Sequence, residues 1–118
     1  TLSMELKDYQ KEIIKFDVNG PLADIEQVNF AFLDKVLGLA GESGEVADKI
    51  KKIIRDQDGI IRENDKSALE KELGDVLWHV ATCARYLGLD LEQVAQANLN
   101  KLESRQLRGK IAGSGDER

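Results

Sequence analysis

The chain has 118 residues, of which 33% are charged and 42% are hydrophobic, and its formal net charge is −5. This length fits one domain, and the single proline with few aromatic residues favours a helical bundle over a sandwich or barrel. The acidic balance argues against nucleic acid as a partner, because phosphate-binding surfaces are usually strongly basic. The lone Cys83 excludes an internal disulfide, and no apolar run approaches the ~20 residues of a membrane span. We therefore expect a soluble, cytoplasmic, all-α protein that binds neither nucleic acid nor membrane.

The spacing of apolar residues predicts a first helix over residues 3–16, with Ser3 as its N-cap. The turn sequence Asn19-Gly20-Pro21 then separates it from a second helix, expected to run from just after Asp24 to about Gln57. The apolar residues of this second helix follow steps of three and four, which predicts a buried seam. The seam consists of Phe32, Val36, Leu39, Val46, Ile50 and Ile53.

Three glycines, Gly38, Gly41 and Gly44, lie inside the predicted second helix. Each glycine costs a helix about 1 kcal/mol relative to alanine. Such a density of glycine indicates either that another group approaches the backbone closely or that the helix packs tightly against a neighbour.

A polar connector from Asp56 to Asp65 precedes a third helix, whose start is predicted by the capping-box sequence Ser67-x-x-Glu70. The apolar stripe of this helix contains Leu69, Leu73, Val76, Val80, Cys83 and Leu87. Gly88 is expected to end the third helix, and Asp90 is expected to cap a fourth.

The fourth helix is predicted to place one face against the others. That face carries Leu91, Val94, Ala95, Asn98 and Leu102. After Arg108 the sequence is too glycine-rich for a helix. The expected organisation is a helical domain over residues 1–108, a bundle of four to five helices, followed by a glycine-rich C-terminal tail over residues 109–118.

Two pairs of acidic residues carry the chemistry: Glu42-x-x-Glu45 and Glu72-x-x-Asp75. Residues at i and i+3 are neighbours on a helix surface, with Cβ atoms roughly 5–6 Å apart, so each pair can point at one place. Two pairs on adjacent antiparallel helices would gather four carboxylates, a charge density that needs a hard divalent cation such as Mg²⁺. Solvated acids on an exposed face are the alternative. The pattern favours a metal site because these residues border the apolar seams and like charges at this spacing destabilise a helix.

A di-iron carboxylate bundle would need two E-x-x-H motifs. The chain has one histidine, His79, which excludes that class. We expect His79 to lie beside the acidic site or at the edge of the core and not to be a metal ligand.

Six further residues are candidates for contact with a substrate. They are Lys49, Lys52, Trp78, Asn98, Lys101 and Arg105. Each also has a structural interpretation: the lysines can neutralise nearby acids, and an amide on an apolar face such as Asn98 can hydrogen-bond between helices. Trp78 can stack on a base or pack against another subunit.

Three segments, GLAGESGEVADKIKK, KELGDVLWHVA and ANLNKLESR, resemble the MazG-type nucleoside triphosphate pyrophosphohydrolases, an all-α superfamily. The resemblance covers about Leu37 to Arg105, and the superfamily's E-x-x-E and E-x-x-D motifs match the two acidic pairs in order. It implies hydrolysis of a nucleoside or deoxynucleoside triphosphate to the monophosphate and pyrophosphate, in nucleotide-pool house-cleaning. Mg²⁺ is the implied cofactor, with Mn²⁺ as a substitute, and it would neutralise charge on the triphosphate.

The same resemblance implies a homo-oligomer, a dimer or tetramer, with sites near subunit interfaces and substrate contacts from Asn98 and Lys101. It names neither the base nor the number of metal ions, and it leaves open which carboxylate activates the water, with Glu45 one candidate. Two other classes remain: a non-catalytic helical module that binds nucleotide or metal, and a purely structural helix-pairing protein. Release of pyrophosphate from nucleotides in Mg²⁺ would distinguish the enzyme from both.

Overall fold

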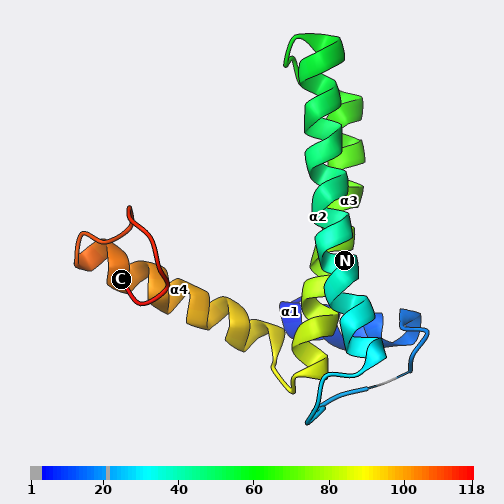
Figure 1. Ribbon diagram of the computed structural model, residues 1–118, viewed down its shortest axis with the longest axis vertical. Helices are drawn as coiled ribbons and strands as arrows, with labels where there is room; N and C mark the ends of the chain where they lie inside the picture. The colour runs from blue at the N-terminus through cyan, green and yellow to red at the C-terminus, as the bar shows by residue number, and fades with distance from the viewer. Residues whose placement is uncertain (1–3, 21) are drawn as a thin grey trace.

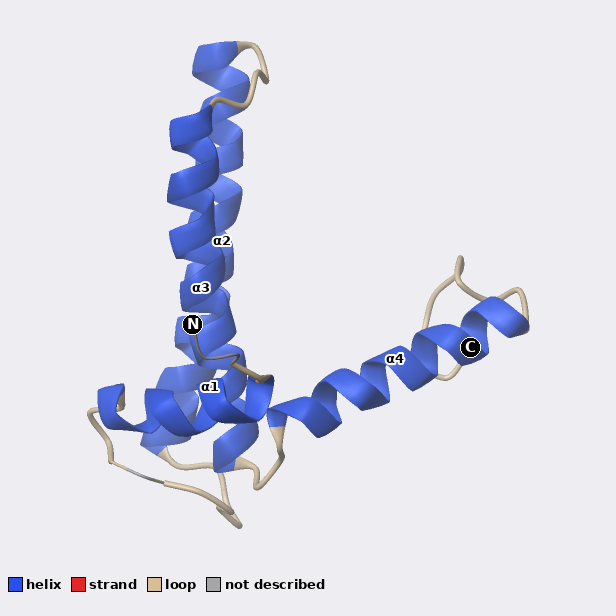
Figure 2. Ribbon diagram, turned by 180° about the vertical axis from the view of Figure 1, so that it is seen from behind, coloured by secondary structure: helices blue, strands red, loops and turns tan. Residues whose placement is uncertain are grey.

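The computed structural model describes residues 4–20 and 22–118, and all regular secondary structure within them is helical. The predicted all-α class is therefore confirmed. The elements in chain order are α1 (Leu6–Glu12), the 3-10 helix η1 (Ile13–Phe16), α2 (Phe30–Gln57), α3 (Glu63–Tyr86) and α4 (Leu91–Leu107). Helices α2 and α3 form a long antiparallel hairpin, α1 and η1 cross its base, and α4 leaves the base on a separate arm (Figure 1, Figure 2).

The first helix is shorter than predicted, because the chain tightens from α1 into η1 at Ile13. Glu5 is the N-cap residue, and its backbone N–H donates to the Asp8 carboxylate over 3.0 Å. The predicted cap, Ser3, lies outside the described residues. Gln10 then fixes α1 to the base: its amide nitrogen donates to the carbonyl oxygens of Ala81 and Leu89, 3.2 and 3.1 Å away.

The prediction that the second helix starts just after Asp24 is wrong. Asp24 has a left-handed backbone with φ of 51°, and the next N–H, that of Ile25, donates to the Tyr86 carbonyl over 2.8 Å. This segment is thus bound to the end of α3 and does not begin a helix. Helix α2 starts at Phe30, where the Asn29 side chain accepts the N–H of Phe32 over 2.8 Å.

The predicted start of the third helix is also wrong, because α3 begins at Glu63, before the Ser67-x-x-Glu70 sequence. The Asp65 carboxylate caps this end by accepting the Arg62 N–H over 2.8 Å, and it also accepts the Gln57 amide over 2.9 Å. The hydroxyl of Ser67 instead donates to the Glu63 carbonyl inside the helix. The Asp65 carboxylate therefore links the end of α2 to the start of α3.

The predicted end of the third helix and the predicted start of the fourth are correct. Helix α3 ends at Tyr86, and Gly88 follows with φ of 72°, the left-handed conformation that glycine adopts without strain. The Asp90 carboxylate caps α4 by accepting the Glu92 N–H over 2.9 Å.

A small apolar core lies at the base of the hairpin, where Ile13, Ala81 and Leu91 are buried and Tyr9, Trp78 and Val80 pack against them. Next to it lies a buried ionic cluster around Asp17. The Asp17 carboxylate accepts hydrogen bonds from Arg85 and from the Tyr86 hydroxyl, both over 2.6 Å, and it pairs with the Lys35 ammonium at 3.3 Å. The cluster joins η1, α2 and α3.

Many residues of the predicted apolar stripes on the helices are exposed. Ile53 is 5% exposed, whereas Leu73 in the middle of the α3 stripe is 56% exposed. The prediction that α4 packs Asn98 and Leu102 inward is wrong for the single chain, because α4 leaves the base and both residues are exposed. Two adjacent helices cover only one stripe of each other, so their flanks stay open without further partners. Within the described residues, no helix combines the length and apolar character needed to cross a lipid bilayer.

Candidate metal centre

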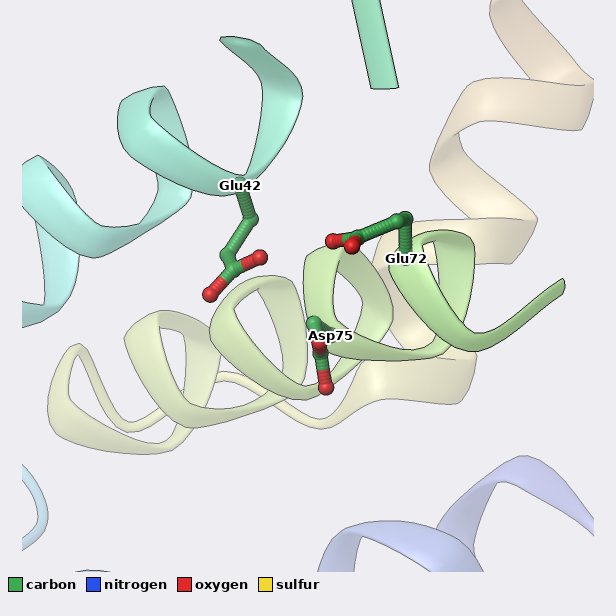
Figure 3. A group of neighbouring side chains, drawn as sticks. All are labelled: Glu42, Glu72 and Asp75. Atoms are coloured by element: carbon green, nitrogen blue, oxygen red, sulfur yellow. The ribbon is translucent and has the colours of Figure 1, made fainter. Parts of the chain in front are cut away.

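Three of the four predicted acidic ligands meet halfway along the hairpin. Glu42 extends from α2 toward α3, where Glu72 and Asp75 occupy successive turns (Figure 3). One carboxylate oxygen from each of the three lies within 4.8 Å of the others. The two residues on α3 are three apart, which places them on one side of the helix as their spacing predicts.

The electrostatics of this group favour a bound cation. Partial desolvation raises the pKa of the Glu42 carboxyl above its ordinary value of 4.5, and the negative charges of Asp75 and Glu72 raise it further. The Lys49 ammonium, 3.7 Å from a Glu72 oxygen, supplies one compensating positive charge. Three carboxylates against one ammonium leave net negative charge, and hard oxygen donors of this kind suit Mg²⁺ or Mn²⁺.

Glu45, the fourth predicted carboxylate, is exposed and does not belong to this group among the described residues. It lies three residues beyond Glu42, about 60° away around the α2 axis. The structure therefore brings together three of the four predicted ligands and leaves the fourth on the flank of the site.

The remaining predicted residue of α2, Lys52, lies one turn beyond Lys49 and pairs with Asp48 at 2.8 Å. The two lysines line a small pocket between α2 and α3 toward the tip of the hairpin. The other residues of that pocket are Ile53, Asp56, Gln57, Asp65, Ala68 and Leu69. Both lysines thus partner nearby acids, the structural role that the sequence allowed, while still bordering a pocket next to the acidic group.

Trp78 and His79 lie on the core side of the acidic group. Trp78 is half-buried against the apolar core, and its ring meets the His79 ring edge-on with centroids 4.9 Å apart. His79 Nδ1 lies 2.8 Å from the Asp75 carbonyl oxygen, so His79 contacts the backbone of a predicted ligand, consistent with the prediction that it lies beside the site.

The candidates on α4 lie on the other arm of the chain, away from the carboxylates (Figure 1). Asn98 and Lys101 border a shallow pocket on α4. Arg105 is buried, because the C-terminal tail folds back along the helix and brings Asp116 to it. The Asp116 carboxylate pairs with Lys101 at 2.9 Å and with Arg105 at 3.2 Å. Within one chain, these cations partner the tail and do not reach the acidic group.

Residues 30–108 match the family of the MazG nucleotide pyrophosphohydrolase domain. The chain belongs to the MazG family. It is also 55% identical over 82 residues to the gene 37 protein of Mycobacterium phage L5, an alignment that covers 70% of this chain and 72% of that protein. No solved structure gives a significant match.

The MazG match contains α2, α3 and α4 and all four acidic residues of the two motifs, which confirms the resemblance seen in the sequence. The family description gives nucleotide pyrophosphohydrolase as the class of activity, and the acidic group gives a place where a divalent metal can bind. Helix α1 lies outside the matched range. Burial raises the pKa of Tyr9 on this helix, and the negative charge of Asp75 adds to this shift. Tyr9 is not among the predicted site residues, because its position relative to Asp75 depends on how α1 crosses the hairpin.

Proposed function

We propose that the chain hydrolyses a nucleoside or deoxynucleoside triphosphate to the monophosphate and pyrophosphate, with Mg²⁺ as cofactor and Mn²⁺ as a substitute. Such an activity would remove unwanted nucleotides from the cytoplasmic pool. Membership of the MazG family supports the class of reaction. The observation that carries the proposal is the convergence of Glu42, Glu72 and Asp75 to within 4.8 Å on facing helices.

In this proposal, Glu42, Glu72 and Asp75 hold the metal, which when bound supplies positive charge against the triphosphate and the charge developing in the transition state. Lys49 neutralises and orients the Glu72 carboxylate, its partner at 3.7 Å. Glu45 is exposed beside the group and is not committed to it, so its carboxylate can accept a proton from the attacking water. The water attacks the α-phosphorus, the bond between the α-phosphorus and the bridging oxygen breaks, and pyrophosphate leaves.

We also propose that the active form is a homo-oligomer, a dimer or tetramer. The accessible surface of the chain is 8,687 Å², whereas a compact monomer of this mass exposes roughly 6,400 Å². Its radius of gyration is 17.1 Å, against about 13.5 Å for a compact domain of this length. The excess surface is comparable to one subunit's share of a large permanent interface.

Assembly of this kind would also give the α4 candidates a route to the site. Asn98, Lys101 and Arg105 lie on the arm that leaves the base, so in an oligomer they can approach the acidic group of another copy. There Asn98 and Lys101 would contact the substrate, and Arg105 would do so only after the Asp116 segment of the tail had moved away from it. Trp78 and Lys52 stay close to the acidic group of their own chain and are weaker candidates for the same role.

Hydrolysis in ¹⁸O-labelled water tests the reaction. The expected products from a mixed panel of triphosphates with Mg²⁺ are pyrophosphate and a monophosphate, with the label in one of them. Release of orthophosphate and a diphosphate as primary products would indicate an ordinary phosphatase. Binding of nucleotide and metal without turnover would favour a non-catalytic module.

The matched variants are Glu42→Gln and Glu70→Gln. The first removes one charge from the acidic group, and activity should fall at least ~100-fold, the range for a lost electrostatic catalyst. The second removes the same charge from an exposed position of α3 outside the group, so activity should be unchanged. Equal activities in the two variants would refute the assignment of the site.

A further inference from the structure

We propose that Gly38 and His79 act together as a spacer that sets the separation of α2 and α3 at the metal centre. Gly38 leaves space for the imidazole ring of His79, and the ring holds the helices at the distance that lets Glu42 reach Asp75. Both are thus positioning residues for the carboxylates. This inference rests on the proposed function, because its target is the acidic group.

The two residues occupy equivalent places on the hairpin. Gly38 lies four residues before Glu42 on α2, and His79 lies four residues after Asp75 on α3. Four residues are about one helical turn, and the two helices run antiparallel. The contact between Gly38 and His79 therefore forms the layer directly next to the layer of Glu42 and Asp75, and a change in helix separation at one is transmitted to the other.

The His79 ring is held in place from its own helix. Its Nδ1 atom lies 2.8 Å from the Asp75 carbonyl oxygen. A carbonyl oxygen can only accept, so Nδ1 carries the proton and donates, which fixes the ring orientation. The Trp78 ring meets it edge-on, with an interplanar angle of 77°. The imidazole is thus tied to the backbone of a metal-ligand candidate and turns its Nε2 edge toward α2.

On α2, only glycine fits opposite the ring. A β-carbon at position 38 would lie 2.5 Å from His79 Cδ2 and closer still to Nε2, distances that real β-carbons essentially never show. The neighbouring Gly41 and Gly44 have no such contact, because a β-carbon at either would meet nothing within 4 Å in the described structure. The close approach that the glycine-rich sequence suggested is therefore confined to Gly38.

Adding a methyl group at position 38 would force either the ring out of its hydrogen bond with Asp75 or the helices apart. Both results move carboxylates that now lie within 4.8 Å of one another. Loss of an interaction that orients a metal ligand costs typically 10–100-fold in metal affinity. Removing the imidazole should act in the same direction, because Asp75 loses its support.

The experiment measures Mn²⁺ affinity by titration calorimetry, together with thermal melts in EDTA, for the wild type and four variants. Gly38→Ala and His79→Ala should each weaken Mn²⁺ binding by about 10–100-fold. The double variant Gly38→Ala/His79→Ala should bind Mn²⁺ more tightly than Gly38→Ala alone, since the methyl group enters the space that the ring has left. Gly41→Ala is the matched control and should bind Mn²⁺ like the wild type.

Several outcomes would overturn the spacer. Gly38→Ala binding Mn²⁺ as tightly as the wild type while melting lower would show a merely structural role. If the loss of Mn²⁺ affinity in the double variant equals the product of the losses in the two single variants, the two residues act independently. If Gly38→Ala does not fold, His79→Ala and the double variant carry the test, and a double variant tenfold weaker than His79→Ala overturns the proposal. A wild type that binds no Mn²⁺ would refute the proposed function itself, whereas normal wild-type binding with no effect of Gly38→Ala would refute only the spacer.

Discussion

Replacing Asp17 with alanine should destabilise the fold by about 3–5 kcal/mol, the usual cost of breaking a buried ion pair by removing one partner. The Asp17 side chain is fully buried, and Arg85 and Lys35 around it are 10% and 4% exposed in their side chains. Without the carboxylate, Arg85 and the Tyr86 hydroxyl lose an acceptor 2.6 Å away. Because whole domains are stable by only about 5–15 kcal/mol, this loss is a large fraction of the total.

The assay is a thermal melt followed by circular dichroism in EDTA. At ~3–6 °C per kcal/mol for a domain of this size, the midpoint should fall by at least about 10 °C. The control is Glu12→Ala, which removes an exposed partner of Lys15 and should change stability by less than about 0.5 kcal/mol. Midpoints for Asp17→Ala and the wild type within 2 °C of each other at neutral pH would refute the role of the buried cluster.

The pH dependence provides an independent check. Desolvation alone would raise the pKa of Asp17, but hydrogen bonds from Tyr86 and the Asn19 N–H, with the Lys35 ammonium, outweigh it and hold the pKa below 3.8. A lowered pKa in the folded state contributes stability above the unfolded value, and that stability is lost as the pH falls through the folded value. The difference in the free energy of unfolding between the wild type and Asp17→Ala should therefore stay constant above about pH 5 and become smaller below pH 3.8. A gap that widens on acidification would contradict the assignment.

Two further predictions concern the site and its assembly. Because the folded-state pKa of Glu42 is raised above 4.5, its ionisation destabilises the metal-free fold as the pH rises through that range. Glu42→Gln should therefore raise the thermal midpoint in EDTA at neutral pH and reduce the further rise that Mg²⁺ produces. The same midpoints for Glu42→Gln and the wild type, both in EDTA and in Mg²⁺, would contradict this prediction. Leu73→Glu places a charge on the exposed stripe of α3 and should yield a monomer by light scattering with unchanged helical content. Lys71→Glu, two residues earlier on the opposite side of α3, should leave the mass unchanged, and a monomeric wild type would refute the proposed oligomer.

The features predicted correctly from the sequence are those set by local signals. Gly88 and Asp90 mark a helix end and a helix start through their own backbone and side-chain preferences. Glu72 and Asp75 share one side of α3 because their spacing alone decides it. The local signal at Ser67-x-x-Glu70 does not set the start of α3, because the helix begins at Glu63. The hydrogen bond from Gln57 to Asp65 near that start joins α2 to α3 and exists only once the hairpin has formed.

The features that escape prediction depend on register between distant segments. No pattern in the sequence marks Asp17, Lys35 and Arg85 as members of a buried cluster, because charged residues are rarely buried unless they are paired. Their pairing needs η1 to cross the base of the hairpin. Likewise, the separation of Glu45 from the other three acids follows from the rotation of α2 against α3, which spacing along one helix does not define.

The arrangement of the acidic group on one hairpin has a consequence for which insertions and deletions the gene tolerates. Glu42 and Asp75 lie on two continuous helices joined by the short connector at residues 58–62. Adding or removing one residue within either helix, between its acidic residues and the connector, turns the carboxylates by about 100° around the axis and moves them off the shared side. A change in length within the connector leaves both faces in place and is absorbed at the tip of the hairpin. Length variation among functional descendants of this chain should therefore collect at residues 58–62 and be absent from the helical segments between them and the acidic residues.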